Sequence, residues 1–219
     1  MRYIYMLPAA FLVPVIHEMV KAICSALQGD PVPKNTGRLT LNPFKHFDPI
    51  GFVFILLFGF GWGNPTPTAA LHYKNRQQGV LITYLVPVLV NLLLGVGAVI
   101  VVAIMTTSTN LQMEGHFAFW LYINTPIFTT DVYLLALILL SHFAFINICI
   151  ALFNIIPVYP LAANKILLQF SRPDTIAKIN HYEKPMQIVL ILLLAFGLIN
   201  QILSPIAMHI IRLVWGVVA

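Results

Sequence analysis

The sequence predicts an all-α integral membrane protein of about four to six transmembrane helices, with a re-entrant or interfacial segment near residues 50–62. Of its 219 residues, 59% are hydrophobic and only 9% are charged, whereas soluble globular domains carry about 25% charged residues. The mean hydropathy of +0.88 indicates that most of the chain is surrounded by hydrocarbon. We expect residues 1–219 to form a single membrane-embedded domain, with no soluble domain of any size.

Four long apolar segments predict the helices that cross the membrane. They are Ile4–Leu27, Val80–Met105, Val132–Ile156 and Met186–Val218. A hydrocarbon core of about 30 Å needs about 20 helical residues, so each of the first three can cross once. The last segment is longer than one span, and we expect it to break near Asn200–Pro205 into a span and a second short helix. The first segment continues past Glu18 without a small-residue cleavage site, so we interpret it as a retained span rather than a signal peptide.

A fifth apolar segment, Ile50–Trp62, is too short to cross. It has 13 residues and ends in glycines. Irregular backbone at membrane depth is tolerated where protein or water satisfies its polar groups. This segment therefore predicts a re-entrant or interfacial element.

The distribution of lysine and arginine supports that topology. Basic residues occur in the loops at 28–49, 63–79 and 157–185, and none occurs in the loop at 106–130. If the short segment does not cross, all three basic loops lie on one side, which the positive-inside rule makes cytoplasmic. The net charge of +5 then reflects topology and anionic headgroups. No basic run interleaved with aromatic residues occurs, so we do not expect nucleic-acid binding.

The first span carries three ionisable residues in the pattern H-E-x-x-K, at His17, Glu18 and Lys21. Ionisable residues within a span are functional candidates by default. On a helix, positions i, i+3 and i+4 share a face, so the three side chains project together. We therefore predict that Lys21 pairs with Glu18 and extends toward the polar loop near Asn164.

Several separated stretches carry a family resemblance. They are "HEMVK" at His17–Lys21, "GRLTLNPFKHFDPIG" at Gly37–Gly51, "VPVLVNLLL" at Val86–Leu94 and "ALFNIIPVYPLAANKIL" at Ala151–Leu167. In this order they resemble the site-2 protease family of intramembrane zinc metalloproteases, in particular its small bacterial branch. Members of that branch typically read H-E-x-x-H, G-R-x-T-L-N-P-x-x-H-x-D-P-x-G, G-P-x-x-N and N-L-x-P-x-P-P-L-D-G. The resemblance implies a protein of a bacterial cytoplasmic membrane.

The resemblance also assigns roles to individual residues and shows that two expected zinc ligands are missing. It makes His17 a vestigial first zinc ligand and Glu18 a vestigial general base. The second ligand position holds Lys21, whose ammonium has no lone pair for a metal, and the aspartate ligand position holds Ala162. Two of three protein ligands are therefore missing, and no zinc or other cofactor is expected.

Four further residues are binding or structural candidates. The family places the asparagine matching Asn91 beside its active site, while intramembrane asparagines commonly join helices by hydrogen bonds. Asn154 and Pro157 are expected to shape the loop after the Val132–Ile156 span, with Asn164 in the polar stretch that follows.

Three functions remain open at this point. The leading one is a catalytically inactive protease-like protein, a pseudoprotease, that acts as a binding or scaffold subunit for other membrane proteins or transmembrane peptides. The alternative is an active intramembrane zinc metalloprotease with displaced ligands, in which His17 is joined by His46 or His142. A third is a polar pathway for ions, which the small number of intramembrane charges argues against.

Overall fold

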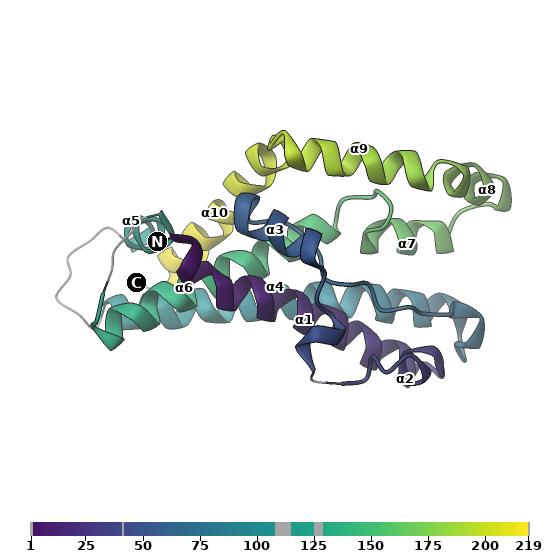
Figure 1. The fold of residues 1–219 in the computed structure, drawn as a ribbon, viewed down its shortest axis with the longest axis horizontal. Helices are drawn as coiled ribbons and strands as arrows, with labels where there is room; N and C mark the ends of the chain where they lie inside the picture. The colour runs from purple at the N-terminus through teal and green to yellow at the C-terminus, as the bar shows by residue number, and fades with distance from the viewer. Residues whose placement is uncertain (1, 41, 108–114, 125–128, 219) are drawn as a thin grey trace.

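A computed structural model of the protein describes residues 2–40, 42–107, 115–124 and 129–218, and this part of the chain contains helices but no strands (Figure 1). The α-helices are α1 (Arg2–Leu27), α2 (Val32–Asn35), α3 (Pro49–Phe58), α4 (Arg76–Thr107), α5 (Gly115–Asn124), α6 (Val132–Asn154), α7 (Ala162–Gln169), α8 (Pro173–His181), α9 (Glu183–Ala195) and α10 (Leu198–Val218). Two 3-10 turns lie at Pro43–Lys45 and Ala70–His72. The all-α prediction is confirmed.

Four of the helices are long and apolar enough to cross a membrane, namely α1, α4, α6 and α10. The protein is therefore an all-α membrane protein. Helices α1, α4 and α6 run alongside one another through the length of the molecule (Figure 1). The segments that contain α2, α7 and α8 lie together at the end of the bundle opposite to α5 (Figure 1). The predicted basic loops 28–49 and 157–185 thus share one end.

The last apolar segment breaks earlier than predicted. Helix α9 ends at Ala195 and α10 begins at Leu198, so the break falls at Phe196 and Gly197 rather than within Asn200–Pro205. Gly197 has φ of 70°, a conformation that glycine adopts without steric cost. Pro205 lies inside α10, because one missing backbone hydrogen bond is tolerated in a membrane helix.

Helix α3 forms the short apolar segment that the sequence predicts as re-entrant or interfacial. Pro49 starts the helix after Asp48, whose side chain accepts a hydrogen bond from the Gly51 N–H at 2.8 Å. The helix ends at Gly59, where φ is 79°, and the chain then runs back beside it. The Asn64 N–H donates to the carbonyl of His46 at 2.8 Å, so both ends of the segment lie side by side.

The return of the chain requires glycines at the point of closest approach. A Cβ added at Gly51 would lie 2.0 Å from the carbonyl oxygen of Trp62. We predict that Gly51→Ala lowers the free energy of unfolding by about 2 kcal/mol, because the backbone must shift to admit the methyl group. Denaturant unfolding in mixed micelles measures the free energy of unfolding of each variant. Gly97→Ala is the control, since among the described residues no atom outside the adjoining helix backbone lies within 4 Å of that added Cβ. Equal stability of the two variants would contradict the packing.

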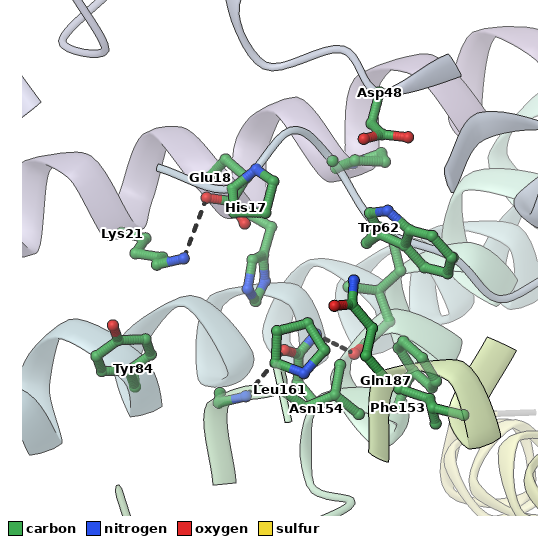
Figure 2. Close-up of a pocket in the computed structure, with 18 of the residues that line it drawn as sticks. His17, Glu18, Lys21, Asp48, Trp62, Tyr84, Phe153, Asn154, Leu161 and Gln187 are labelled. Carbon is green, nitrogen blue, oxygen red and sulfur yellow. Dashed lines mark hydrogen bonds and ion pairs between the residues drawn. The ribbon is translucent and has the colours of Figure 1, made fainter. Parts of the chain in front are cut away.

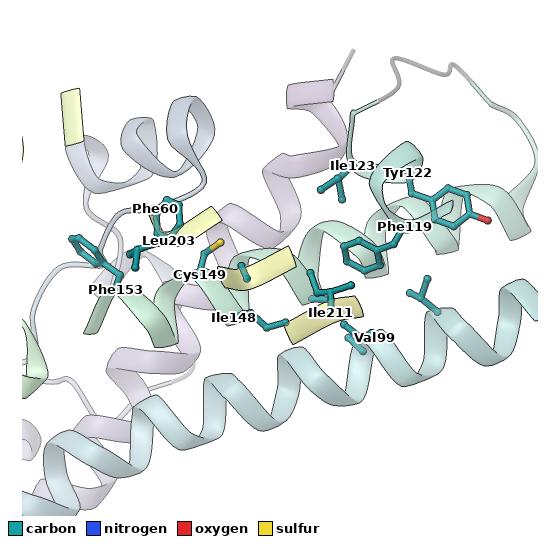
Figure 3. Close-up of a cluster of buried hydrophobic side chains, with 14 of the residues drawn as sticks. Phe60, Val99, Phe119, Tyr122, Ile123, Ile148, Cys149, Phe153, Leu203 and Ile211 are labelled. Atoms are coloured by element: carbon teal, nitrogen blue, oxygen red, sulfur yellow. The ribbon is translucent and has the colours of Figure 1, made fainter. Parts of the chain in front are cut away.

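The main hydrophobic core joins α4, α5, α6 and α10 (Figure 3). Val99 of α4, Phe119 of α5, Ile148 of α6 and Ile211 of α10 are all fully buried there. The Phe119 ring packs edge-on against Trp215 of α10, with centroids 6.5 Å apart. The core therefore holds α10 against the bundle, and Leu190 and Leu194 of α9 also belong to it, although most of α9 lies farther out (Figure 1).

Candidate functional site

The ionisable residues of α1 lie inside the bundle and contact one another. His17 and Glu18 are each 7% exposed. The Lys21 ammonium lies 3.3 Å from Oε2 of Glu18, so the predicted pair is present, with side chains 12% and 9% exposed. The same ammonium lies 5.4 Å from the centroid of the Tyr84 ring on α4, within reach of a cation–π contact. Among the described residues, Lys21 makes no hydrogen bond to Asn164.

Glu18 also anchors the chain that returns from α3. The backbone N–H of Thr66 donates to Oε2 of Glu18 at 2.6 Å, and the Thr66 hydroxyl donates to the Glu18 carbonyl at 3.1 Å. The carboxylate thus accepts from both an ammonium and a peptide N–H. Glu18 therefore fixes the position of the segment that follows the re-entrant helix.

A chain of buried hydrogen bonds joins α1, α4 and α6. Nδ1 of His17 donates to Oδ1 of Asn91 at 3.0 Å, and Nδ2 of Asn91 donates to Oδ1 of Asn147 at 3.1 Å. Nδ2 of Asn147 then donates to the carbonyl of Phe143 at 2.8 Å. Asn91 and Asn147 are fully buried. Hydrogen bonds of this kind hold transmembrane helices together, which is the structural alternative that the sequence left open for Asn91.

A pocket of about 180 Å³ lies beside these polar groups (Figure 2). His17, Glu18 and Lys21 line one wall, and Asn154 and Ala162 line another. Further lining comes from the returning chain at 61–65, from Tyr84 of α4, and from Gln187, Leu190 and Ile191 of α9. The fold thus brings the positions near residue 20 and near residue 160 into one pocket.

The other predicted residues lie at the edge of the pocket or outside it. Nδ2 of Asn154 donates to the Ile150 carbonyl at 3.0 Å, and its Oδ1 accepts from the Ala162 N–H at 3.4 Å, which shapes the loop after α6. Pro157 is exposed and does not line the pocket. Asn164 is buried, and its Oδ1 has no hydrogen-bond partner among the described residues.

The histidines considered as displaced ligands lie elsewhere. Neither His46 nor His142 lines the pocket. Nε2 of His46 bonds the Thr40 carbonyl at 3.1 Å, and Nδ1 of His142 bonds the Ile138 carbonyl at 2.8 Å. In the part of the chain that the structure describes, no group of three or more His, Cys, Asp or Glu side chains is placed to hold a metal ion.

Asp30, which follows α1, is a buried carboxylate that was not among the residues predicted from the sequence. Its oxygens accept from the Ala69 N–H at 2.7 Å, the Ser25 hydroxyl at 2.8 Å and the Val32 N–H at 3.0 Å. Burial opposes the charged form, but these hydrogen bonds and nearby His72 outweigh it and lower the pKa of Asp30 below its ordinary value. The Gly-Asp-Pro turn at 29–31 was the available sequence signal.

Asp30 predicts a dependence of stability on pH. Above its ordinary pKa of about 3.9 the ionised group stabilises the fold fully, and this contribution is lost as the pH falls through its lowered pKa. We expect Asp30→Asn to lower the free energy of unfolding by about 1–2 kcal/mol at pH 7. The difference between variant and parent should shrink in acid, measured by unfolding from pH 7 down to about pH 3. A difference that stays constant with pH would contradict this role.

Comparison with known proteins supports a metalloprotease-like family. The protein "Putative zinc metalloprotease YwhC" of Bacillus subtilis (strain 168) is 29% identical to this chain over 197 residues, which cover 87% of this chain and 80% of that protein. No family model and no solved structure matches the chain. The likeness covers most of the chain, and the relative is bacterial.

Proposed function

We propose that this chain is a catalytically inactive member of the site-2 protease family, a pseudoprotease that acts as a binding or scaffold subunit of a membrane complex. The observation that carries the proposal is the ion pair of Lys21 and Glu18 in the pocket. A general base must be available to a water molecule, whereas Glu18 is engaged by the Lys21 ammonium and the Thr66 N–H. In this arrangement the carboxylate is a structural anchor.

The residues at the three expected zinc-ligand positions also favour an inactive protein. A catalytic zinc takes three protein ligands and one water molecule. His17 offers an imidazole, but Lys21 offers a cation without a lone pair and Ala162 offers only a methyl group. These residues do not fit a catalytic zinc. The Lys21 ammonium instead supplies positive charge beside a carboxylate, which makes the pocket stable without a metal.

The pocket, at about 180 Å³, suits one or a few side chains that project from another membrane protein. Its walls combine apolar side chains with a few polar groups from Asn154 and Gln187, the composition typical of a binding site. Helix α9 and the loop after α6 both contribute to its lining. We propose transmembrane peptides or other membrane proteins as partners, in a bacterial cytoplasmic membrane with the basic loops on the cytoplasmic side.

The alternative is an active intramembrane zinc metalloprotease, and the name of the Bacillus subtilis relative favours it. It requires a ligand set other than the one the resemblance assigns. His46 and His142 would have to approach His17, whereas both bond backbone carbonyls outside the pocket. The alternative thus requires His46 or His142 to give up its present hydrogen bond and turn toward His17.

Metal content and cleavage distinguish the two functions. The protein is purified without added zinc, analysed for bound metal, and reconstituted with a model transmembrane substrate. The proposal expects substoichiometric zinc and no cleavage with or without added zinc. Stoichiometric zinc, or cleavage that a chelator abolishes and zinc restores, would replace it with the alternative. Substrate that is bound but left intact would support it further.

A further inference from the structure

A second cavity lies outside the candidate site, between α9, α10 and the chain at 156–158. Its volume is about 690 Å³, and every atom that lines it is apolar. Val189 and Leu193 of α9 face Ile202 of α10 across it, and Tyr182 lies at the end nearest α8. Helices α9 and α10, which both line the cavity, are joined by the turn at Gly197 (Figure 1).

The lining and the size of the cavity restrict its occupant. Wholly apolar cavities do not hold ordered water, and the volume falls within the range of about 300–1,000 Å³ typical of small-molecule sites. An acyl chain from the surrounding bilayer fits both restrictions.

Basic residues outnumber acidic residues in the chain next to the cavity. Lys178 in the last turn of α8 and Lys184 in the first turn of α9 flank Tyr182, and both are exposed. Neither makes an ion pair with any described residue, whereas Glu183 is engaged by Lys165 at 3.5 Å. Asp174 at the start of α8 is the remaining acidic group of this segment. The chain next to the lining residues Tyr182 and Pro185 therefore carries a net positive charge, and tyrosine is typical of the headgroup level.

We propose that this cavity is a site for an anionic phospholipid, with an acyl chain between α9 and α10 and the headgroup phosphate held by Lys178 and Lys184. The proposal does not depend on whether the protein is a protease. Leu190 lines both this cavity and the pocket of the candidate site, so α9 forms a wall that the two share. A lipid in this position would support α9 from the side opposite to the pocket.

Quenching by brominated lipids tests the site directly. Val189→Trp places a fluorophore in the cavity, and Leu93→Trp on α4 (70% exposed) reports on bulk lipid. Signal from the native Trp62, Trp120 and Trp215 is subtracted with the parent protein. Each variant is reconstituted in phosphatidylcholine vesicles that contain increasing fractions of brominated phosphatidylglycerol.

We expect half-maximal quenching of Val189→Trp at about a 30-fold lower fraction of brominated phosphatidylglycerol than that of Leu93→Trp, since each of the two lysines contributes about a factor of five. Adding Lys178→Gln and Lys184→Gln should remove the difference, and brominated phosphatidylcholine should quench both reporters alike. Equal curves for the two reporters, or a difference that survives the lysine substitutions, would overturn the proposal. Absence of any quenching at Val189→Trp would show that lipid does not enter the cavity, and would overturn it too.

Discussion

Glu18→Gln is expected to lower the free energy of unfolding by about 3 kcal/mol, because it leaves the Lys21 ammonium buried without a carboxylate. Glutamine keeps an oxygen that can accept from the Thr66 N–H, so the change isolates the charge rather than the hydrogen bond. Replacing both members of the pair, as Glu18→Gln with Lys21→Met, should restore stability to within about 1 kcal/mol of the parent, since no charge is then left buried. Denaturant unfolding in mixed micelles measures all three proteins.

The pair of Lys165 and Glu183 provides a matched control. Its atoms lie 3.5 Å apart, but the side chains are 32% and 28% exposed. Glu183→Gln should therefore change stability by less than about 1 kcal/mol. If Glu18→Gln had no larger effect than Glu183→Gln, or if Lys21→Met gave no rescue, the pair of Lys21 and Glu18 would not be the buried anchor that the proposed function requires.

Local chemistry made part of the site predictable from the sequence. Charged residues within an apolar helix marked the position of the site, since such residues are costly in lipid. The spacing of Glu18 and Lys21 by three residues placed them on one face, and they do form a pair. The length of Ile50–Trp62 predicted an apolar helix too short to cross, and α3 has only 10 residues.

Contacts between distant segments could not be predicted in this way. Thr66 reaches Glu18 across 48 residues and Asn147 reaches Asn91 across 56, and both contacts depend on how the helices pack. The break before α10 was misplaced for a related reason. The predicted break included Pro205, but a membrane helix can continue through a proline, whereas Gly197 takes a positive φ that ends α9.

Combining Lys21→His with Ala162→Asp is expected to convert the pocket into a zinc site. Both positions line the pocket with His17, so the double variant would offer two imidazoles and a carboxylate around one space. Three such ligands and a water molecule are what zinc requires. We expect the purified double variant to retain about one zinc per chain after dialysis, and the parent and each single variant to retain almost none. Elemental analysis measures the metal, and a zinc-dependent rise in melting temperature provides an independent readout.

Asn164→Asp combined with Lys21→His tests whether zinc binding requires the carboxylate at position 162 itself. Asn164 lies two residues from Ala162 on the same helix but does not line the pocket, so its carboxylate should add no zinc binding. The Lys21→His and Ala162→Asp variant could retain no more zinc than this control. Positions 17, 21 and 162 would then not form one site, and the relation of this pocket to a zinc site would be wrong. If the variant with Ala162→Asp gained zinc and the parent did not, Lys21 and Ala162 would account for the loss of metal binding, because reversing these two residues alone would restore it.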